Sequence, residues 1–387
     1  PKLMKNTEEQ QRIQLKTAAR NIVVKVGTRV LTNKGRVDYE QLSKLVHQLH
    51  ELGSQDRRVT LVSSGAVGTA MTLLNSDRPK GLGDLQAFAA IGQAELIHLY
   101  NKEFTKFGRY AAQVLLTADD MNHRKRYLNL RNTFFALFEL GATPIVNEND
   151  CVATDEIAIT FGDNDRLAAT VAMLVDADLL IILSDVDSLY SRHPSDPAAK
   201  RISFVESIDE SVANLASDST GLGSDGQFSK GGMSSKISAA KMATSAGIPA
   251  IVAGGRVENI LPKLLSAESH GTLFGSVQPS MSSWKRWLKS STEAVGKLVV
   301  DEGAVQAIHQ NGKSLLPIGV KQISGDFQKG DLVLIGGPNG NVVAHGVSNY
   351  SSTDAAKICG QHSERIAECL GRNADSELVH RNNLVLV

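Results

Sequence analysis

Residues 22–28 read IVVKVGT, an apolar run that carries one lysine and ends at a glycine. Four of its first five residues are β-branched, which is typical of a strand buried on both faces of a parallel sheet. Lys25 is an unusual residue for such a strand, and Gly27 permits a sharp turn directly after it. The stretch therefore predicts a buried strand whose end presents a lysine.

Five further apolar runs resemble this one and alternate with helical patterns. The expected strands are Ile22–Val26, Val59–Val62, Ala112–Leu116, Pro144–Val146, Leu179–Leu183 and Ala250–Ala253. The expected helices are Tyr39–Leu52, Leu85–Phe104, Arg126–Leu140, Asp165–Val175 and Gly232–Ala246. This alternation favours an α/β fold in which helices cover both faces of a mainly parallel sheet, a three-layer αβα sandwich.

The pattern changes near residues 280–297, which are polar and lack strand periodicity. Beyond them, short strand-like runs are separated by frequent turn signals, which indicates a small β-rich domain. The predicted divisions are an N-terminal extension (1–20), the α/β domain (21–280), a linker (281–295), the β-rich domain (296–371) and a C-terminal tail (372–387).

Composition limits the classes of function. The 387 residues hold 41 Lys+Arg and 41 Asp+Glu, so no bulk charge would attract nucleic acid or a membrane. The three scattered cysteines do not suggest a disulfide framework and fit a reducing compartment. No apolar run approaches the roughly 20 residues of a membrane helix, and the first 20 residues lack the apolar core of a secretory signal. We therefore expect a cytoplasmic protein.

Polar residues follow four of the expected strands at their carboxyl ends, where ligands bind in open parallel sheets. The first strand carries Lys25 and runs into Gly27, and the others run into Ser64 with Gly65, into Asn147–Asp150, and into Ser184 with Asp185. Glycines after buried strands leave backbone N–H groups accessible to an anion. Four such clusters on one edge of a sheet predict a cleft.

A fifth glycine signal opens the last expected helix of the α/β domain. It consists of Lys230, Gly231, Gly232, Met233, Ser234, Ser235 and Lys236. A helix N-terminus beside a lysine suits a phosphate, although a plain turn is the alternative for so short a motif. No P-loop is present. The GLGSDG run at 221–226 has no preceding strand, so it is not a dinucleotide fingerprint, and no metal-ligating residues are predicted.

Residues 146–166 hold six carboxylates, which would repel a phosphate unless cations accompany them. Suitable cations are Mg²⁺, an ammonium group on the acceptor, and the lysines Lys25 and Lys236. A site that used all three would transfer a phosphoryl group to an amino-acid-like acceptor. Asp165 is then placed to hold both lysines, and Asp150 with Asn147 suits the ammonium group.

Five motifs in order resemble the glutamate 5-kinase family of the amino acid kinase superfamily. They are Lys25–Thr28, Ser63–Ala66, Asn147–Thr154, Gly162–Asp165 and Gly231–Lys236. Residues 299–304 through 345–348 are similar to the PUA domain that many bacterial members carry. The likeness runs from about residue 21 to 371, and the combination is far more specific than any single motif.

The resemblance implies ATP-dependent phosphorylation of the γ-carboxylate of L-glutamate, the first step of proline synthesis. It also implies Mg²⁺, inhibition by proline, a homo-oligomer, and hand-over of the product to glutamyl phosphate reductase. By matching positions, Lys25 and Lys236 are catalytic and Asp165 organises them. The implied glutamate-binding residues are Ser64, Gly65, Asn147, Asp150 and Asn164. The implied ATP-binding residues are Lys25, Gly27, Ser184, Asp185 and residues 230–236.

The chain departs from the family pattern in three places. About 15 extra residues precede the first strand, the loop between Asp150 and Asp163 is longer, and residues 224–230 extend a loop that in the family lies over the nucleotide. Sister kinases for aspartate, N-acetylglutamate, carbamate or UMP remain alternatives, as do an RNA-binding protein and an inactive regulator. The mixed charge of residues 296–371 argues against RNA.

Overall fold

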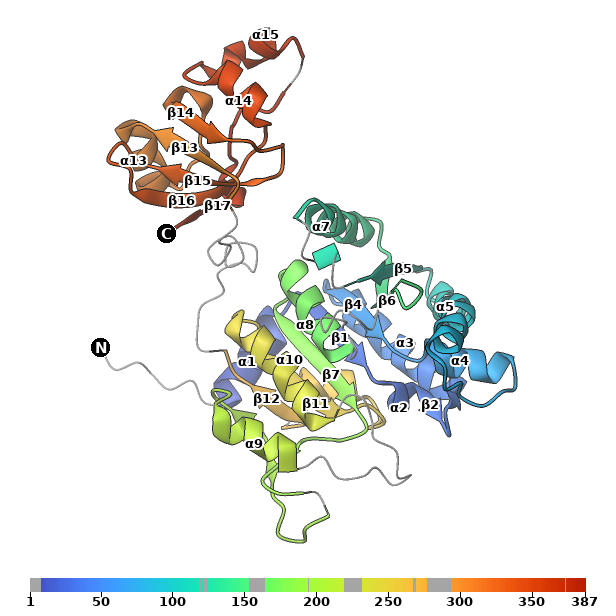
Figure 1. Ribbon diagram of the computed structural model, residues 1–387. Helices are drawn as coiled ribbons and strands as arrows, with labels where there is room; N and C mark the ends of the chain where they lie inside the picture. Colours follow the sequence, from blue (N-terminus) through green and yellow to red (C-terminus); the bar gives the residue numbers. More distant parts are fainter. Residues whose placement is uncertain are drawn as a thin grey trace. The chain divides into compact units, whose positions relative to one another are not determined.

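The computed structural model describes residues 8–117, 120–121, 124–152, 164–193, 195–218, 232–266, 269–276, 294–372 and 374–387. The chain forms two compact units (Figure 1). The N-terminal unit holds the strands from β1 to β12, and the C-terminal unit holds those from β13 to β17.

An eight-stranded sheet forms the centre of the N-terminal unit, in the order β10-β12-β11-β7-β1-β4-β6-β5. Six of the strands are parallel: β1 (Asn21–Val26), β4 (Arg58–Ser63), β5 (Ala111–Leu116), β6 (Thr143–Glu148), β7 (Leu179–Ser184) and β11 (Ala250–Gly254). All six were expected, so the prediction of a mainly parallel sheet is confirmed. The short strands β12 (Thr272–Phe274) and β10 (Phe204–Val205) complete one edge, and β12 runs antiparallel to β11.

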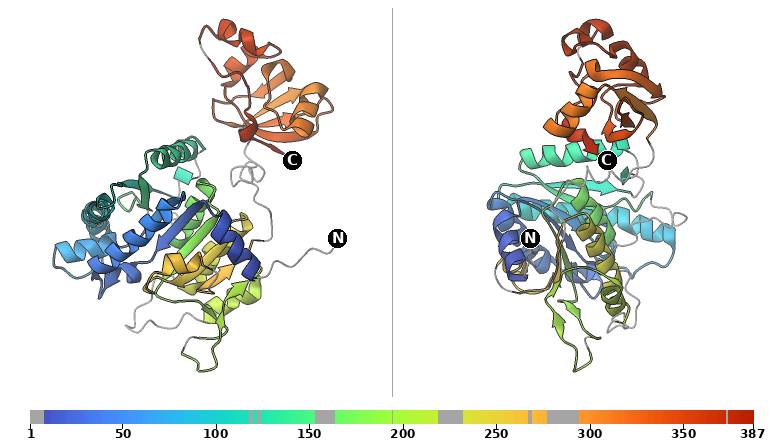
Figure 2. Two further views of the ribbon diagram at one scale, coloured as in Figure 1. Left: turned by 180° about the vertical axis from the view of Figure 1, so that it is seen from behind. Right: turned by 90° about the vertical axis from the view of Figure 1, so that its left-hand side faces the viewer.

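Helices cover both faces of this sheet (Figure 2). The larger ones are α3 (Tyr39–Ser54), α4 (Ala66–Leu73), α5 (Leu82–Thr105), α7 (Arg124–Glu139), α8 (Asn164–Leu174), α9 (Glu210–Asp218) and α10 (Met233–Ser245). On one face, α3, α5 and α11 (Ile260–Leu264) share a hydrophobic core with Ile22, Val24 and Val26 of β1. Because side chains alternate along a strand, Val23 and Lys25 point to the other face, which α8 covers.

The N-terminal extension takes part in this unit. Residues 8–18 form α1 (Glu8–Ala18), and Arg12 on this helix is only 3% exposed. Its guanidinium donates to the carbonyl of His270 at 3.2 Å and to that of Ser203 at 3.3 Å, next to the strands β12 and β10. The helix therefore binds the edge of the sheet where its strands are shortest.

The helices α4 and α5 approach each other closely just after β4. An ideal Cβ placed on Gly92 would lie 1.8 Å from the carbonyl oxygen of Ala66 and 2.8 Å from the amide nitrogen of Ala70. Both contacts are with backbone, which cannot move aside as a side chain could. Gly92 therefore permits α5 to pack directly on the first turn of α4.

Gly92→Ala is expected to lower the free energy of unfolding by at least the ~1–3 kcal/mol typical of overpacked cores, although alanine favours a helix. Gly83 lies in the same helix, and a Cβ added there would have nothing within 4 Å, which makes it the matched control. Gly83→Ala should raise stability by about 0.5–1 kcal/mol. Urea unfolding of both variants checks this pair, and equal effects would contradict the close contact.

The C-terminal unit is built on a five-stranded sheet in the order β14-β13-β15-β16-β17. Its elements are β13 (Gly296–Val300), α13 (Glu302–Asn311), β14 (Val320–Gly325), β15 (Leu332–Gly336), β16 (Val342–Val347), α14 (Ser352–Ile358), α15 (Ile366–Leu370) and β17 (Leu384–Leu386). Its own hydrophobic core includes Leu298, Phe327 and Ile335. The expected small β-rich domain is confirmed.

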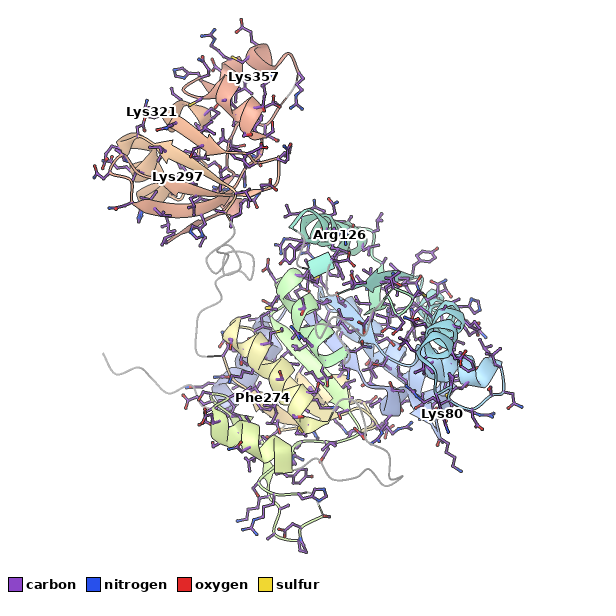
Figure 3. The ribbon with its side chains drawn as sticks, viewed as in Figure 1. Lys80, Arg126, Phe274, Lys297, Lys321 and Lys357 are labelled. Atoms are coloured by element: carbon purple, nitrogen blue, oxygen red, sulfur yellow. The ribbon has the colours of Figure 1, made fainter. Side chains whose placement is uncertain are left out.

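Charged side chains of this unit are interspersed in sign. Figure 3 labels Lys297, Lys321 and Lys357, which come from three different elements. The ammonium of Lys321 lies 3.1 Å from Asp301, and that of Lys357 lies 3.6 Å from Asp354. Two of these three lysines are therefore paired with carboxylates.

Candidate active site

A buried carboxylate between two lysines forms the centre of the site. Asp165, in the first turn of α8, has no solvent exposure. Its Oδ1 lies 2.5 Å from the ammonium of Lys25, and its Oδ2 lies 3.5 Å from the ammonium of Lys236. Lys25 and Lys236 are only 4% and 5% exposed. The structure thus brings together the three residues that the sequence predicted as catalytic.

Three elements deliver these side chains. Lys25 lies on β1 and faces α8, and Lys236 lies in the first turn of α10, whose residue Ser235 also donates to Asp165 at 3.3 Å. Two ammonium groups share this one carboxylate, so the three side chains together carry a net positive charge in a desolvated position. Such a charge favours an anion and would be costly without one.

Gly27 follows β1 directly. Its N–H donates to the carbonyl of Leu183 at 3.1 Å and so extends the pairing of β1 with β7. This amide is therefore used within the sheet, and the part of Gly27 in nucleotide binding stays a prediction. A Cβ on Gly27 would lie 3.7 Å from the ammonium of Lys25, so the lack of a side chain leaves that ammonium uncrowded.

A second cluster, the amide cluster, gathers Ser64, Asn147 and Asn164 at the carboxyl ends of β4 and β6 and at the start of α8. The Nδ2 atom of Asn164 lies 2.9 Å from Ser64 Oγ and 3.0 Å from Asn147 Oδ1. Gly65, which follows Ser64, has a φ of +109°, a backbone conformation that favours glycine. Asp165 follows Asn164 directly, so the amide cluster adjoins the lysine centre.

Asp150 lies two residues beyond β6 and is half-buried. Burial raises the pKa of its carboxyl above the usual range of an aspartate. A buried carboxylate of this kind favours a cationic partner.

Two polar residues of α5 also belong to this region, although the sequence did not point to them. Gln93 is 8% exposed, and its Oε1 accepts a hydrogen bond from Asn147 at 2.8 Å. Tyr100 is fully buried, and its hydroxyl lies 2.8 Å from Ser63 Oγ. The two residues are seven positions apart, on one face of the helix. That spacing inside an apolar helix face is the signal that could have identified them.

Ser184 and Asp185 end β7 on the other side of Lys25. Ser184 Oγ donates to Asp185 at 3.0 Å, and Arg29 forms an ion pair with Asp185 at 3.0 Å. Burial alone would raise the pKa of Asp185, but the hydrogen bonds from Arg29 and Ser184 and the charge of Lys236 hold it below its usual value. Arg29 is a further residue that the sequence did not indicate.

The glycine-rich signal is described only in part. Gly232 precedes α10 as its N-cap, Met233 and Lys236 are buried, and Ser234 is exposed. Lys230 and Gly231 lie outside the described residues, as do residues 153–163 of the acidic stretch. Within the described residues, no group of three or more His, Cys, Asp or Glu side chains could hold a metal ion. Cys151, Cys359 and Cys369 are free thiols.

A separate cavity of about 640 Å³ opens at the opposite, amino-terminal ends of β1, β4 and β6. Two arginines in its wall contact helix C-termini. Arg57 donates to the carbonyl of Lys16 in the last turn of α1 and to that of Ala19 just after the helix, and Arg109 donates to the carbonyl of Gly53 in α3. Such contacts stabilise helix C-termini. We therefore assign these arginines a structural part, away from the lysine centre.

The comparisons with known proteins agree with this geometry. The model of the amino acid kinase family matches residues 20–254, and that of the PUA domain matches residues 296–370. A "Glutamate 5-kinase" from Rhodopirellula baltica is 45% identical over 94% of this chain and 93% of its own length. Another from Pseudomonas putida is 44% identical over 96% of this chain and 99% of its own length.

Among solved structures, a carbamate kinase from Giardia lamblia bound to AMP-PNP matches 67% of this chain and 99% of its own. With an identity of 14% and a TM-score of 0.47, this likeness is weak. The family model covers most of the N-terminal unit, and the curated relatives span nearly the whole chain. This chain therefore belongs to the amino acid kinase family, and within it to the glutamate 5-kinases.

Proposed function

We propose that this chain transfers the γ-phosphoryl group of ATP to the γ-carboxylate of L-glutamate and releases L-glutamyl 5-phosphate and ADP. The observation that carries the proposal is the buried centre of Lys25, Asp165 and Lys236 beside the amide cluster. The curated relatives named glutamate 5-kinase support the acceptor. The reaction would be the first step of proline synthesis.

In the proposed reaction, an oxygen of the γ-carboxylate forms a bond to the γ-phosphorus while the bond to the β,γ-bridging oxygen breaks. Lys25 and Lys236 offset the negative charge on the transferred group, and Asp165 holds both ammonium groups in position. No proton has to be removed from an ionised carboxylate, so the site needs no general base.

The nucleotide would lie over the ends of β1, β7 and α10. We assign its binding to Lys25, to the space left by Gly27, to Ser184 and Asp185, and to residues 230–236. The net positive charge of the lysine centre fits a polyphosphate. Mg²⁺, when bound with the nucleotide, would neutralise charge on the phosphates.

The acceptor would lie against the amide cluster. We assign glutamate binding to Ser64, Gly65, Asn147, Asp150 and Asn164. Asp150 suits the α-ammonium group because burial leaves its carboxylate short of solvation. UMP would instead bring a phosphate toward this carboxylate, and N-acetylglutamate has no ammonium group to pair with it.

Turnover of Mg-ATP in the presence of hydroxylamine tests the function. An acyl phosphate reacts to a coloured hydroxamate, so the assay should respond to glutamate and not to aspartate, N-acetylglutamate or UMP. A response to a different acceptor would overturn the part assigned to Asp150 while keeping the phosphoryl transfer. No turnover with any acceptor would overturn the proposal.

Asp150→Asn is expected to raise the KM for glutamate by roughly 10–100-fold, the usual weight of one charge-assisted hydrogen bond. The raised pKa adds a pH signature: as the pH falls through it, Asp150 takes up a proton and loses its attraction for ammonium. In wild type, kcat/KM for glutamate should therefore fall at low pH, and this fall should be absent in Asp150→Asn. The exposed Asp77→Asn is the control, and an unaltered KM would remove Asp150 from the acceptor site.

We further propose that the protein is cytoplasmic, that it forms a homo-oligomer, that proline inhibits it, and that its labile product passes to glutamyl phosphate reductase. The three free cysteines support a reducing compartment. No helix in the described part of the chain is long and apolar enough to cross a membrane. Light scattering and a proline titration of the hydroxamate assay test the oligomer and the inhibition.

A further inference from the structure

Gln93 is buried at the edge of the candidate site but belongs to none of the motifs that identify it. It lies on α5, directly after Gly92, whose missing side chain brings this helix against the backbone of α4. Its Oε1 accepts a hydrogen bond from Asn147 Nδ2 at 2.8 Å, and both residues are buried. A buried amide pair of this kind has a defined direction, because each amide has one donor end and one acceptor end.

Hydrogen-bond donation runs from Asn164 to Asn147 and from Asn147 to Gln93. Since Nδ2 of Asn147 is used by Gln93, its Oδ1 faces the other way and accepts from Asn164 Nδ2 at 3.0 Å. The backbone N–H of Glu148 donates to the same Oδ1 at 2.9 Å. Asn147 is therefore held by two neighbours in one orientation.

The orientation of Asn147 in turn fixes that of the Asn164 amide. Its Nδ2 is directed to the acceptors Asn147 Oδ1, Ser64 Oγ and the carbonyl of Ser63, at 2.9–3.0 Å. Among the described residues no hydrogen-bond donor reaches its Oδ1, which lies on the opposite side of the amide from Nδ2. A reversed amide would present N–H groups there, and these would repel a cation instead of binding it.

We propose that Gln93 is a positioning residue for the acceptor substrate. By fixing the direction of Asn147 it keeps Asn164 Oδ1 available to accept from the α-ammonium group of an amino acid. Gln93 thus favours acceptors that carry a free ammonium group over dicarboxylates that lack one. The identity of the acceptor rests on the proposed function.

The test compares glutamate with glutarate, which has the same two carboxylates but no ammonium group. Gln93→Met removes the amide at nearly constant volume. It is expected to raise the KM for glutamate about tenfold or more, to leave the KM for ATP unchanged, and to leave the inhibition constant of glutarate within about twofold of wild type. Gln93→Glu keeps an oxygen that accepts from Asn147, so it should restore the KM for glutamate to within about threefold of wild type.

Gln48→Met is the matched control. Gln48 is also a buried amide, 5% exposed, and its Oε1 accepts from the backbone N–H of Leu261 at 3.0 Å, away from the site. This variant should lower the thermal unfolding midpoint without changing the preference for glutamate over glutarate. Gln93→Ala, which adds no bulk, serves in place of Gln93→Met if the latter does not fold.

Equal weakening of glutamate and glutarate by Gln93→Met would show a merely structural part and overturn the inference, as would an unchanged KM for glutamate. These outcomes are distinct from failure of the proposed function. In that case the wild-type chain itself would form no hydroxamate with glutamate, whereas the inference concerns how a working enzyme selects its acceptor.

Discussion

Lys236→Met should lower kcat by about 10³-fold and leave the folded chain about as stable as the wild type. The ammonium of Lys236 lies at the start of α10, 3.5 Å from Asp165, where it would meet charge that develops during phosphoryl transfer. Removal of one such preorganised group typically costs about 10²–10³-fold, and removal of a cation at a transferred phosphate costs about 10³–10⁵-fold. The KM for glutamate should change little, because the amide cluster and Asp150 remain.

The stability expected of Lys236→Met follows from the charges of Lys25, Asp165 and Lys236. Lys25 and Asp165 form a buried pair at 2.5 Å, and Lys236 brings a second positive charge to the same carboxylate. Methionine nearly conserves the volume, and removal of the second positive charge leaves Lys25 and Asp165 as a neutral pair, so little stability should be lost. Steady-state kinetics and thermal unfolding measure both effects.

Lys241→Met, on the exposed face of the same helix, is the matched control and should leave turnover unchanged. A kcat within tenfold of wild type in Lys236→Met would remove this lysine from the catalytic centre. A large loss of stability would instead show that the lysine is a structural partner of Asp165.

The parallel core of the fold could be predicted because burial on both faces selects a recognisable sequence. The runs that became β1, β7 and β11 are buried along their whole length and are mostly apolar, with Lys25 as the one charged residue. The edge strands β10 and β12 have two and three residues, too few to show a period. They form because they pair with a neighbouring strand and contact α1. Such contacts between distant segments are not visible in the local sequence.

The site residues also fall into two groups, those that the sequence indicated and those that depend on tertiary contacts. Lys25 and Lys236 were visible as charges in places where burial was expected, and Asp165 was visible as a carboxylate at a helix start. Gln93 was overlooked, because a single amide inside a long helix looks like an ordinary surface residue unless its seven-residue spacing from Tyr100 is compared with the apolar face of the helix. The hydrogen bond from the Gly27 amide to Leu183 could not be predicted, because it joins segments that are distant in the sequence.

Asp165→Asn is expected to damage both folding and catalysis, in contrast to Lys236→Met. Asp165 is fully buried and contacts both ammonium groups, so asparagine would remove the charge that neutralises two lysines that are 4% and 5% exposed. Breaking a buried ion pair by removing one partner typically costs about 3–5 kcal/mol. Turnover should fall as well, since the lysines lose the group that fixes their positions.

The double variant Asp165→Asn with Lys236→Met isolates this interaction. If the cost comes from the two ammonium groups that Asp165 neutralises, removing one of them should return part of the lost stability, so the two single effects will not add. Urea unfolding of the wild type, both single variants and the double variant gives the coupling free energy directly. Strict additivity would mean that Asp165 stabilises the fold through packing or through Ser235, which donates to the same carboxylate at 3.3 Å, and that the lysines are held by other means.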